Sequence, residues 1–202
     1  MLNIQQCLIP AYLLFLLVTS ISSLDCDSLY FYLRNVSLDG MILLRKMSKG
    51  EFPLQCLKTR MDFEFSQELL PPNQSLTDVK IAIYEMSQQI FNIFSQNYLP
   101  LTWEEENVQK IQIKLDHQSE YLQRCLEEDE KEKEVLEKED EDEISYSGLT
   151  VLQLNNLELR KYFKRIGSFL KEKEYSHCAW EIVRLEMRRC FYTLQKLISQ
   201  LK

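Results

Sequence analysis

The sequence predicts an all-α protein built as a bundle of five helices with two long connections. Of its 202 residues, 45% are hydrophobic, and only four are glycine and five proline, which is too few for a turn-rich β architecture. Apolar residues recur every three or four positions in five separate segments, as in amphipathic helices. The length is that of a single domain. Helices that each bury one face are stable only when packed together, so we expect a bundle.

The first two predicted helices, residues 27–47 and 77–96, each carry one apolar stripe. Gly40 is a weak point in the first helix, because glycine is a poor helix former. The stripes consist of Leu29, Leu33, Val36, Leu43 and Met47, and of Val79, Ile83, Met86, Ile90 and Ile93 or Phe94. The connection between them, residues 48–75, contains three prolines and Cys56. We expect a long loop that a disulfide ties to the bundle.

The third predicted helix opens at Pro100, with Thr102 and Glu105 spaced as a capping box. Its apolar residues are Val108, Ile111, Leu115, Leu122 and Cys125. Residues 127–143 then hold twelve acidic side chains and three lysines, a net charge of −9. The whole chain carries −7, so the remainder is near +2. With few apolar residues to bury, residues 127–147 are predicted to be a solvated, flexible loop with room for one further helical turn.

The last two predicted helices, residues 151–173 and 178–201, are separated by a short polar break at 174–177. Their apolar residues are Leu159, Tyr162, Phe163, Ile166, Phe169 and Leu170, followed by Trp180, Val183, Met187, Phe191, Leu194 and Ile198. Short connections predict that the second and third helices are antiparallel, as are the fourth and fifth. The two long connections are typical of bundles with crossover loops.

The N-terminal segment, residues 1–23, has no charged side chain. Its apolar stretch, residues 8–18, is too short to span a bilayer, and small residues follow it. We interpret it as a secretory signal peptide ahead of one domain at 24–202, with a signal anchor as the alternative. Five cysteines then remain, which suggests two disulfides and one thiol in any of fifteen arrangements. Asn35 and Asn73 begin N-glycosylation sequons.

Catalytic, metal and nucleic-acid patterns are missing from the sequence. Its two histidines, His117 and His177, lie in no recognisable nucleophile pattern, and no phosphate-binding loop or zinc spacing occurs. The acidic run lacks the alternating ligands and central glycine of a calcium loop. No basic stripe with interleaved aromatic residues is present. We therefore expect no enzyme activity, cofactor, metal, nucleic-acid partner or membrane insertion.

Residues 162–180, YFKRIGSFLKEKEYSHCAW, resemble the signature of the type I interferons. CLKTRMDFEFSQE from Cys56, YEMSQQIFNIFSQ, LRKYFKRI and CAWEIVRLEMRRC resemble other parts of that family. Four further features resemble one member of the family in particular. They are LDC at residues 24–26, CLEED from Cys125, the acidic insertion, and the arginine pair before Cys190. The resemblance implies a five-helix long-chain cytokine bundle, with a four-helix up-up-down-down core plus an extra helix. It also implies a secreted, monomeric ligand that bridges the two subunits of the type I interferon receptor and triggers JAK-STAT antiviral and immune signalling.

The resemblance further implies two disulfides, a free thiol and two receptor-binding faces. The disulfides are Cys26–Cys125 and Cys56–Cys178, with Cys190 left as a shielded thiol. The high-affinity subunit would contact Leu57, Arg60, Arg184, Leu185, Arg188 and Arg189, and the low-affinity subunit Tyr84, Glu85, Gln88, Phe91, Asn92 and Arg160. Spacing puts Arg184, Leu185 and Arg188 on the side of their helix away from its apolar stripe. Arg188 departs from the family, since many relatives have an apolar residue there.

Four alternatives to these functional interpretations remain open. The arginines of the last helix could be an ordinary solvated basic face, and Phe91 could belong to the core. The bundle could be a helical cytokine that acts through a different receptor. It could also be a secreted carrier of an apolar ligand, which would show a bound small molecule and no receptor dependence.

Overall fold

The computed structural model describes residues 26–48, 52–65, 75–137 and 146–202, with the backbone alone for 132–137 and 146–156. Residues 1–23 and the sequon at Asn73 lie outside the described residues. The described part is all-helical, as predicted, and its elements follow the chain order η1 (Cys26–Ser28), α2 (Leu29–Met47), η2 (Leu54–Thr59), α3 (Leu76–Phe94), α4 (Glu105–Glu137), α5 (Tyr146–Glu172), α6 (His177–Ile198) and η4 (Ser199–Leu201). None of the helices in these ranges is long and apolar enough to cross a membrane.

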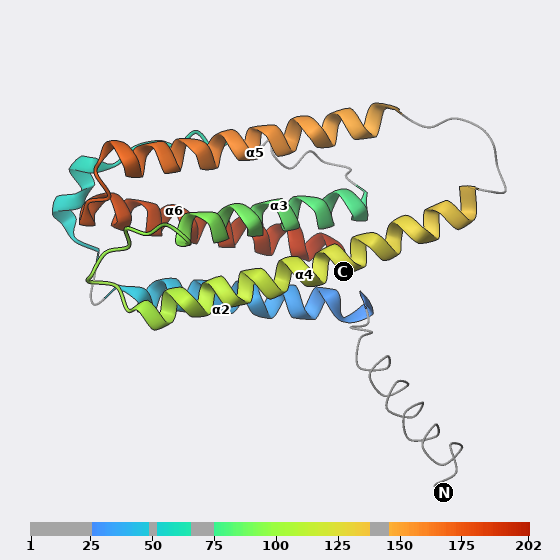
Figure 1. The fold of residues 1–202 in the computed structure, drawn as a ribbon, viewed down its shortest axis with the longest axis horizontal. Helices are drawn as coiled ribbons and strands as arrows, with labels where there is room; N and C mark the ends of the chain where they lie inside the picture. Colours follow the sequence, from blue (N-terminus) through green and yellow to red (C-terminus); the bar gives the residue numbers. More distant parts are fainter. Residues whose placement is uncertain (1–25, 49–51, 66–74, 138–145) are drawn as a thin grey trace, which may run out of the picture.

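Four of the helices, α2, α3, α4 and α6, form the core of the bundle. Figure 1 shows that α2 and α3 run in one direction and that α4 and α6 run in the other. The fifth helix, α5, runs parallel to α2 and packs against α3 and α6. This arrangement confirms the predicted up-up-down-down core with one additional helix. It also makes α3 and α4 antiparallel, and α5 and α6 likewise.

Aromatic side chains pack in the core at the end of the bundle where α4 and α6 begin. Trp180 is fully buried, packs edge-on against Trp103 at 5.3 Å, and donates its indole N–H to the carbonyl oxygen of Tyr98 at 2.7 Å. At the interface of α2 and α6, Gly40 faces the ring of Phe191, and a Cβ atom at Gly40 would lie 2.3 Å from it. Gly40 is therefore needed for the close approach of these two helices, which explains why a poor helix former occurs in the middle of α2.

Two features of α4 differ from the sequence prediction. The helix continues to Glu137, well into the acidic run, so residues 127–137 are not a flexible loop. The capping box predicted at Thr102 is not the one found: α4 begins at Glu105, and the Thr102 hydroxyl lies 3.2 Å from Nδ1 of His177. A capping box occurs instead at the start of α3, where Ser75 and Asp78 each accept the other's backbone N–H.

Two disulfides tie the short 3₁₀ turns η1 and η2 to the bundle. Cys26 is joined to Cys125 of α4, so the N-terminal turn is held beside the distal half of that helix. Cys56 of η2 is joined to Cys178 in the first turn of α6. Their Cα atoms lie 5.7 and 4.9 Å apart, as disulfide geometry requires. Each bond links residues about a hundred positions apart in the sequence.

Candidate functional site

The segment 52–65 lies along α5 and α6 and is held there by several independent contacts. Besides the Cys56–Cys178 bond, Phe63 is buried and packs edge-on against Phe169 of α5 at 5.2 Å. Arg165 of α5 donates to the carbonyl oxygens of Phe63 and Glu64 at 3.0 and 3.2 Å. This loop therefore has a fixed path over the bundle, although most of its side chains face solvent.

A first exposed surface, the η2–α6 face, is formed by Leu57, Arg60, Leu185, Arg188 and Arg189. The two leucines are 49% and 39% exposed, and all three arginines are exposed. η2 packs against α6, so both elements belong to one region of the surface. Exposed leucines beside planar guanidinium groups have the composition of a binding hot spot for an apolar and acidic partner.

Arg189 is held in place by the loop that it lies beside. Its guanidinium stacks over the ring of Phe65 at 4.8 Å and also approaches the carbonyl oxygen of Phe65 and the carboxylate of Glu186, each at 3.5 Å. About half of its side chain stays exposed. Stacking on an aromatic ring restricts the rotamers of a long side chain, so less conformational entropy is lost when a partner binds.

Arg184 does not fit the prediction that it lies away from the core. Its side chain is only 12% exposed and pairs with Glu181, which is fully buried, at 2.8 Å. It also donates to the carbonyl oxygen of Leu44 on α2 at 3.4 Å. Spacing alone misplaced this residue, because α2 covers that flank of α6. Arg184 is thus a core ion-pair partner and is largely hidden from any receptor.

Glu181 is the acceptor at the centre of this buried cluster. It receives hydrogen bonds from the Arg184 guanidinium and from the Trp103 indole N–H at 2.9 Å. Burial alone would raise the pKa of this carboxyl, but the hydrogen bonds from Arg184, Trp103 and Ser48 outweigh it and lower the pKa. Since these groups come from different elements, the cluster links α6 to the chain before α4 and to the end of α2.

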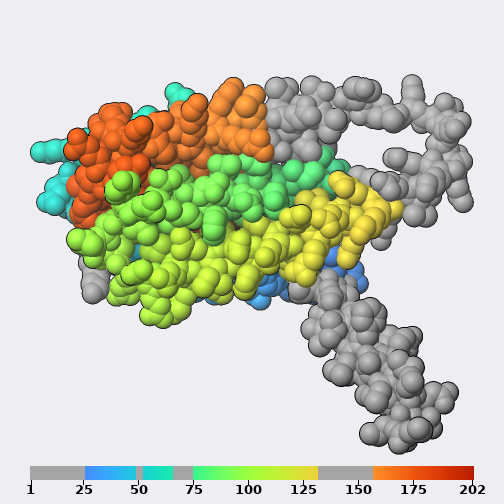
Figure 2. Space-filling view, in the orientation of Figure 1, coloured from blue at the N-terminus to red at the C-terminus, as the bar shows by residue number. Residues whose placement is uncertain are grey.

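A second surface, the α3–α5 face, contains the residues predicted for the low-affinity subunit. In Figure 2 α3 lies between α4 and α5 on the face toward the viewer. Only Asn92 and Arg160 are exposed, while Gln88 is half-buried. Tyr84 and Phe91 are also half-buried and pack against the core, so Phe91 lies between the two predictions: it is neither fully exposed nor one of the buried core residues.

Glu85 and Arg160 form a two-point ion pair between α3 and α5. The guanidinium of Arg160 donates to both carboxylate oxygens of Glu85, at 2.7 and 2.9 Å, and Gln89 donates a third hydrogen bond at 2.9 Å. Burial of Glu85 opposes ionisation, but these hydrogen bonds lower its pKa below the ordinary value. Glu85 therefore fixes Arg160 in place, and only the outer side of Arg160 can meet a partner.

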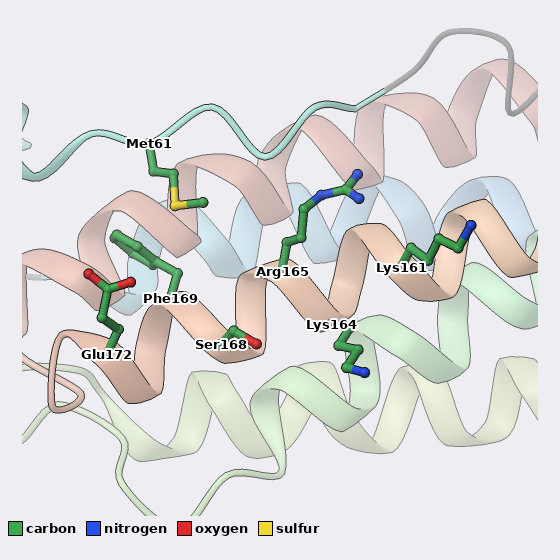
Figure 3. A pocket seen from close by; sticks show the side chains of 7 residues that line it. All are labelled: Met61, Lys161, Lys164, Arg165, Ser168, Phe169 and Glu172. Atoms are coloured by element: carbon green, nitrogen blue, oxygen red, sulfur yellow. The ribbon is translucent and has the colours of Figure 1, made fainter.

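A pocket of about 310 Å³ lies between the segment 52–65 and α5 (Figure 3). Met61 and Phe169 supply its apolar lining, and the polar lining consists of Ser168, Glu172 and three cationic side chains, Lys161, Lys164 and Arg165. These cations do not converge: Figure 3 shows Lys161 and Lys164 pointing in different directions. Lys161 is paired with Glu158 at 2.7 Å, and Arg165 is bonded to the loop backbone. The pocket thus has no preformed site for an anion.

Cys190 is a buried free thiol on α6. The Tyr162 hydroxyl donates a hydrogen bond to the carboxylate of Glu186 at 2.7 Å. Because that hydroxyl has only one hydrogen, the S–H of Cys190 is the donor in the 3.3 Å contact between Cys190 and Tyr162. Burial raises the pKa of the Cys190 thiol to about 12. A protonated and inaccessible thiol is a poor nucleophile, so Cys190 is shielded from exchange with other cysteines.

Three exposed apolar residues near the η2–α6 face were missed from the sequence. Leu54 and Met61 flank Leu57 in the same loop and are 77% and 40% exposed. Tyr192 is 56% exposed, and the Lys196 ammonium lies 5.0 Å from the centre of its ring. The helical spacing 185, 188 and 192 could have identified Tyr192, whereas nothing in the loop sequence distinguishes Leu54. Across the described ranges, no three His, Cys, Asp or Glu side chains are grouped to hold a metal ion.

Comparison with known proteins gives consistent matches over nearly the whole chain. A family model described as the interferon alpha/beta domain matches residues 29–201. Interferon kappa from Homo sapiens is 47% identical, over 97% of this chain and 94% of its own length. Interferon beta from Homo sapiens is 35% identical, over 98% of both chains. Interferon kappa is the member that the CLEED and acidic-insertion motifs resemble.

A solved structure shares the fold. Zebrafish interferon 2 superimposes with a TM-score of 0.63 over 82% of this chain and 96% of its own, at 24% sequence identity. That similarity shows that this chain has the fold of the solved interferon.

Proposed function

Because the chain belongs to the interferon alpha/beta family, we propose that it brings together the two subunits of the type I interferon receptor and so triggers JAK-STAT antiviral and immune signalling. It is an interferon cytokine and not an enzyme. We further propose that residues 1–23 are a signal peptide, that residues 24–202 are secreted as one domain, and that the ligand is a monomer.

The observation that carries this proposal is the η2–α6 face. Leu57 and Leu185 are exposed apolar side chains on elements that the Cys56–Cys178 bond holds together. Arg60, Arg188 and Arg189 are also exposed on this face. A face that combines exposed leucines with guanidinium groups fits a receptor surface that has an apolar patch and carboxylates. We assign this face to the high-affinity subunit.

The α3–α5 face is assigned to the low-affinity subunit. Gln88, Asn92 and the outer side of Arg160 supply polar contacts, while Tyr84 and Phe91 present partly exposed aromatic edges. The α3–α5 face exposes fewer apolar groups than the η2–α6 face, which agrees with weaker binding to its receptor subunit. No bond is made or broken on the ligand: two faces of one rigid bundle hold two receptors so that their intracellular kinases meet.

Antiviral protection of cultured cells tests this function. Purified protein should protect cells that carry the type I interferon receptor, and protection should vanish when either receptor subunit is deleted. Protection that persists in both deleted lines would indicate a helical cytokine with a different receptor. If no cell responds and native mass spectrometry finds a bound lipid, the protein is an apolar-ligand carrier and the proposal is wrong.

A further inference from the structure

An apolar stripe runs along the outer face of α2. Phe31, Leu38 and Ile42 are 64%, 38% and 40% exposed. Their spacing of seven and four residues places them on one side of a helix. Exposed side chains of this size on one helix face are uncommon unless something covers them.

The stripe points away from the rest of the bundle. The flanks of α2 are occupied by its neighbours: Asp39 pairs with Lys114 of α4 at 2.7 Å, and Ser37 donates to the carbonyl oxygen of Phe191 on α6 at 3.1 Å. The face with Phe31, Leu38 and Ile42 lies between these flanks on the solvent side. The core contacts of α2 therefore do not account for the apolar residues of the stripe.

Asn35 lies in the middle of the same face. It is four residues after Phe31, three before Leu38 and seven before Ile42, and its side chain is exposed. Asn35-Val36-Ser37 is an N-glycosylation sequon. The attachment atom for a glycan is thus at the centre of the only apolar stripe that α2 exposes.

The position of Ser37 constrains when a glycan could be attached. The enzyme that modifies Asn35 must reach the Ser37 hydroxyl, which in the folded protein is fully buried and bonded to α6. Transfer to Asn35 must therefore precede the packing of α2 against α6. A nascent chain that enters the secretory pathway meets this condition.

We propose that an N-linked glycan on Asn35 covers the stripe of Phe31, Leu38 and Ile42 and prevents copies of the protein from associating through it. The sugar rings nearest the asparagine have apolar C–H faces that can lie on the Phe31 ring, and the outer sugars are hydrated. Glycan transfer requires the proposed secretory route but does not depend on which receptor the protein binds.

The test uses the full chain secreted from mammalian cells. Intact mass and peptide mapping should find a glycan at Asn35. Asn35→Gln, with Asn73→Gln as the matched control, should shift the light-scattering mass from monomer toward dimer and larger species, and the control should not. Enzymatic removal of the glycan from the folded wild-type protein should cause the same shift, which separates an effect on association from an effect on folding. Adding Phe31→Ser, Leu38→Ser and Ile42→Ser to Asn35→Gln should restore the monomer.

Several results would overturn the proposal. A secreted protein with a glycan at Asn73 but none at Asn35 contradicts it while leaving the proposed secretion intact. A protein that never leaves the cell contradicts the secretory route itself. An unglycosylated protein that stays monomeric contradicts the covering role, and if it also binds receptor more tightly, the stripe is a receptor contact.

Discussion

The two arginines of α6 that resemble receptor contacts have different environments. Arg184 is nearly buried against Glu181, whereas Arg189 is stacked on Phe65 with about half of its side chain exposed. From their positions in the sequence motif, both arginines are equally expected to contact the receptor. The difference arises from α2, which packs over one flank of α6 and leaves the other open.

Substitution of these arginines should separate stability from binding. Arg184→Ala leaves Glu181 buried without its ion-pair partner and should destabilise the fold by about 3–5 kcal/mol. Arg189→Ala should leave the melting temperature nearly unchanged and weaken binding to the high-affinity subunit by about 1–3 kcal/mol. Thermal unfolding and receptor affinity, measured on both variants, decide this. An Arg184→Ala protein as stable as wild type would show that the buried pair has no structural importance.

Stability should fall in acid because of two carboxylates. Glu85 and Glu181 both have pKa values lowered by hydrogen bonds in the folded protein. A carboxyl with a lowered folded-state pKa stabilises the fold above its unfolded pKa, and this contribution disappears as the pH falls through the folded value. The free energy of unfolding should therefore decline below about pH 4.5. In Glu85→Gln the decline should be shallower, and an unchanged acid limb would contradict the role of this pair.

Gly40 should not tolerate a side chain, even though alanine is the better helix former. A Cβ atom would lie 2.3 to 2.8 Å from three ring atoms of Phe191, which is fully enclosed. We expect Gly40→Ala to cost about 1–3 kcal/mol from overpacking, more than the gain in helix propensity of up to about 1 kcal/mol. Gly167→Ala is the matched control, because nothing lies within 4 Å of that position, and it should stabilise α5 slightly. Chemical denaturation of both variants measures this, and equal stabilities would contradict it.

At the scale of elements, the sequence predicts the helices closely because each has a regular apolar stripe. The starts and ends of α2, α3 and α6 fall within three residues of the expected positions, whereas α5 begins at Tyr146, five residues before its predicted start. The 3₁₀ turn η2 was not predicted, since it is too short to show a period. Arg184 was misplaced for a related reason: periodicity identifies the face that meets the core but not a neighbour that covers its edge.

The extension of α4 to Glu137 was not predicted, because few apolar residues are available there for tertiary packing. Helix propensity and local pairing supply another source of order: glutamate and lysine are good helix formers. Gln123 donates to Glu127 one turn later at 3.1 Å, and Lys80 of α3 pairs with Asp129 at 2.8 Å. Charge composition alone therefore underestimated the order of this segment.

The two disulfides should differ in their effect on receptor binding. In the chain-entropy model each closes a loop of about a hundred residues and contributes about 4–5 kcal/mol. Cys56–Cys178 also positions Leu57 and Arg60 beside α6, whereas Cys26–Cys125 lies at the distal half of α4. Replacing Cys56 and Cys178 with serine should reduce affinity for the high-affinity subunit more than replacing Cys26 and Cys125 with serine. Equal losses at equal stability would show that the bond does not position the face.

For the whole molecule, bridging of two receptors requires two separate faces on one rigid bundle. The η2–α6 face and the α3–α5 face are built on different helices, and the buried core joins them. We therefore expect two receptors to bind at once without competing. The receptor that we propose follows from the family resemblance, and the structure adds which residues of each face are exposed.

Assembly of the purified ligand with both receptor ectodomains tests whether the protein bridges two receptors. Light scattering on the three-component mixture should give the mass of a complex with one copy of each. Leu57→Ala with Leu185→Ala should remove the high-affinity subunit from that complex, and Asn92→Ala with Arg160→Ala should remove only the low-affinity subunit. A mixture that forms binary complexes alone, with each ectodomain displacing the other, would contradict bridging by two faces.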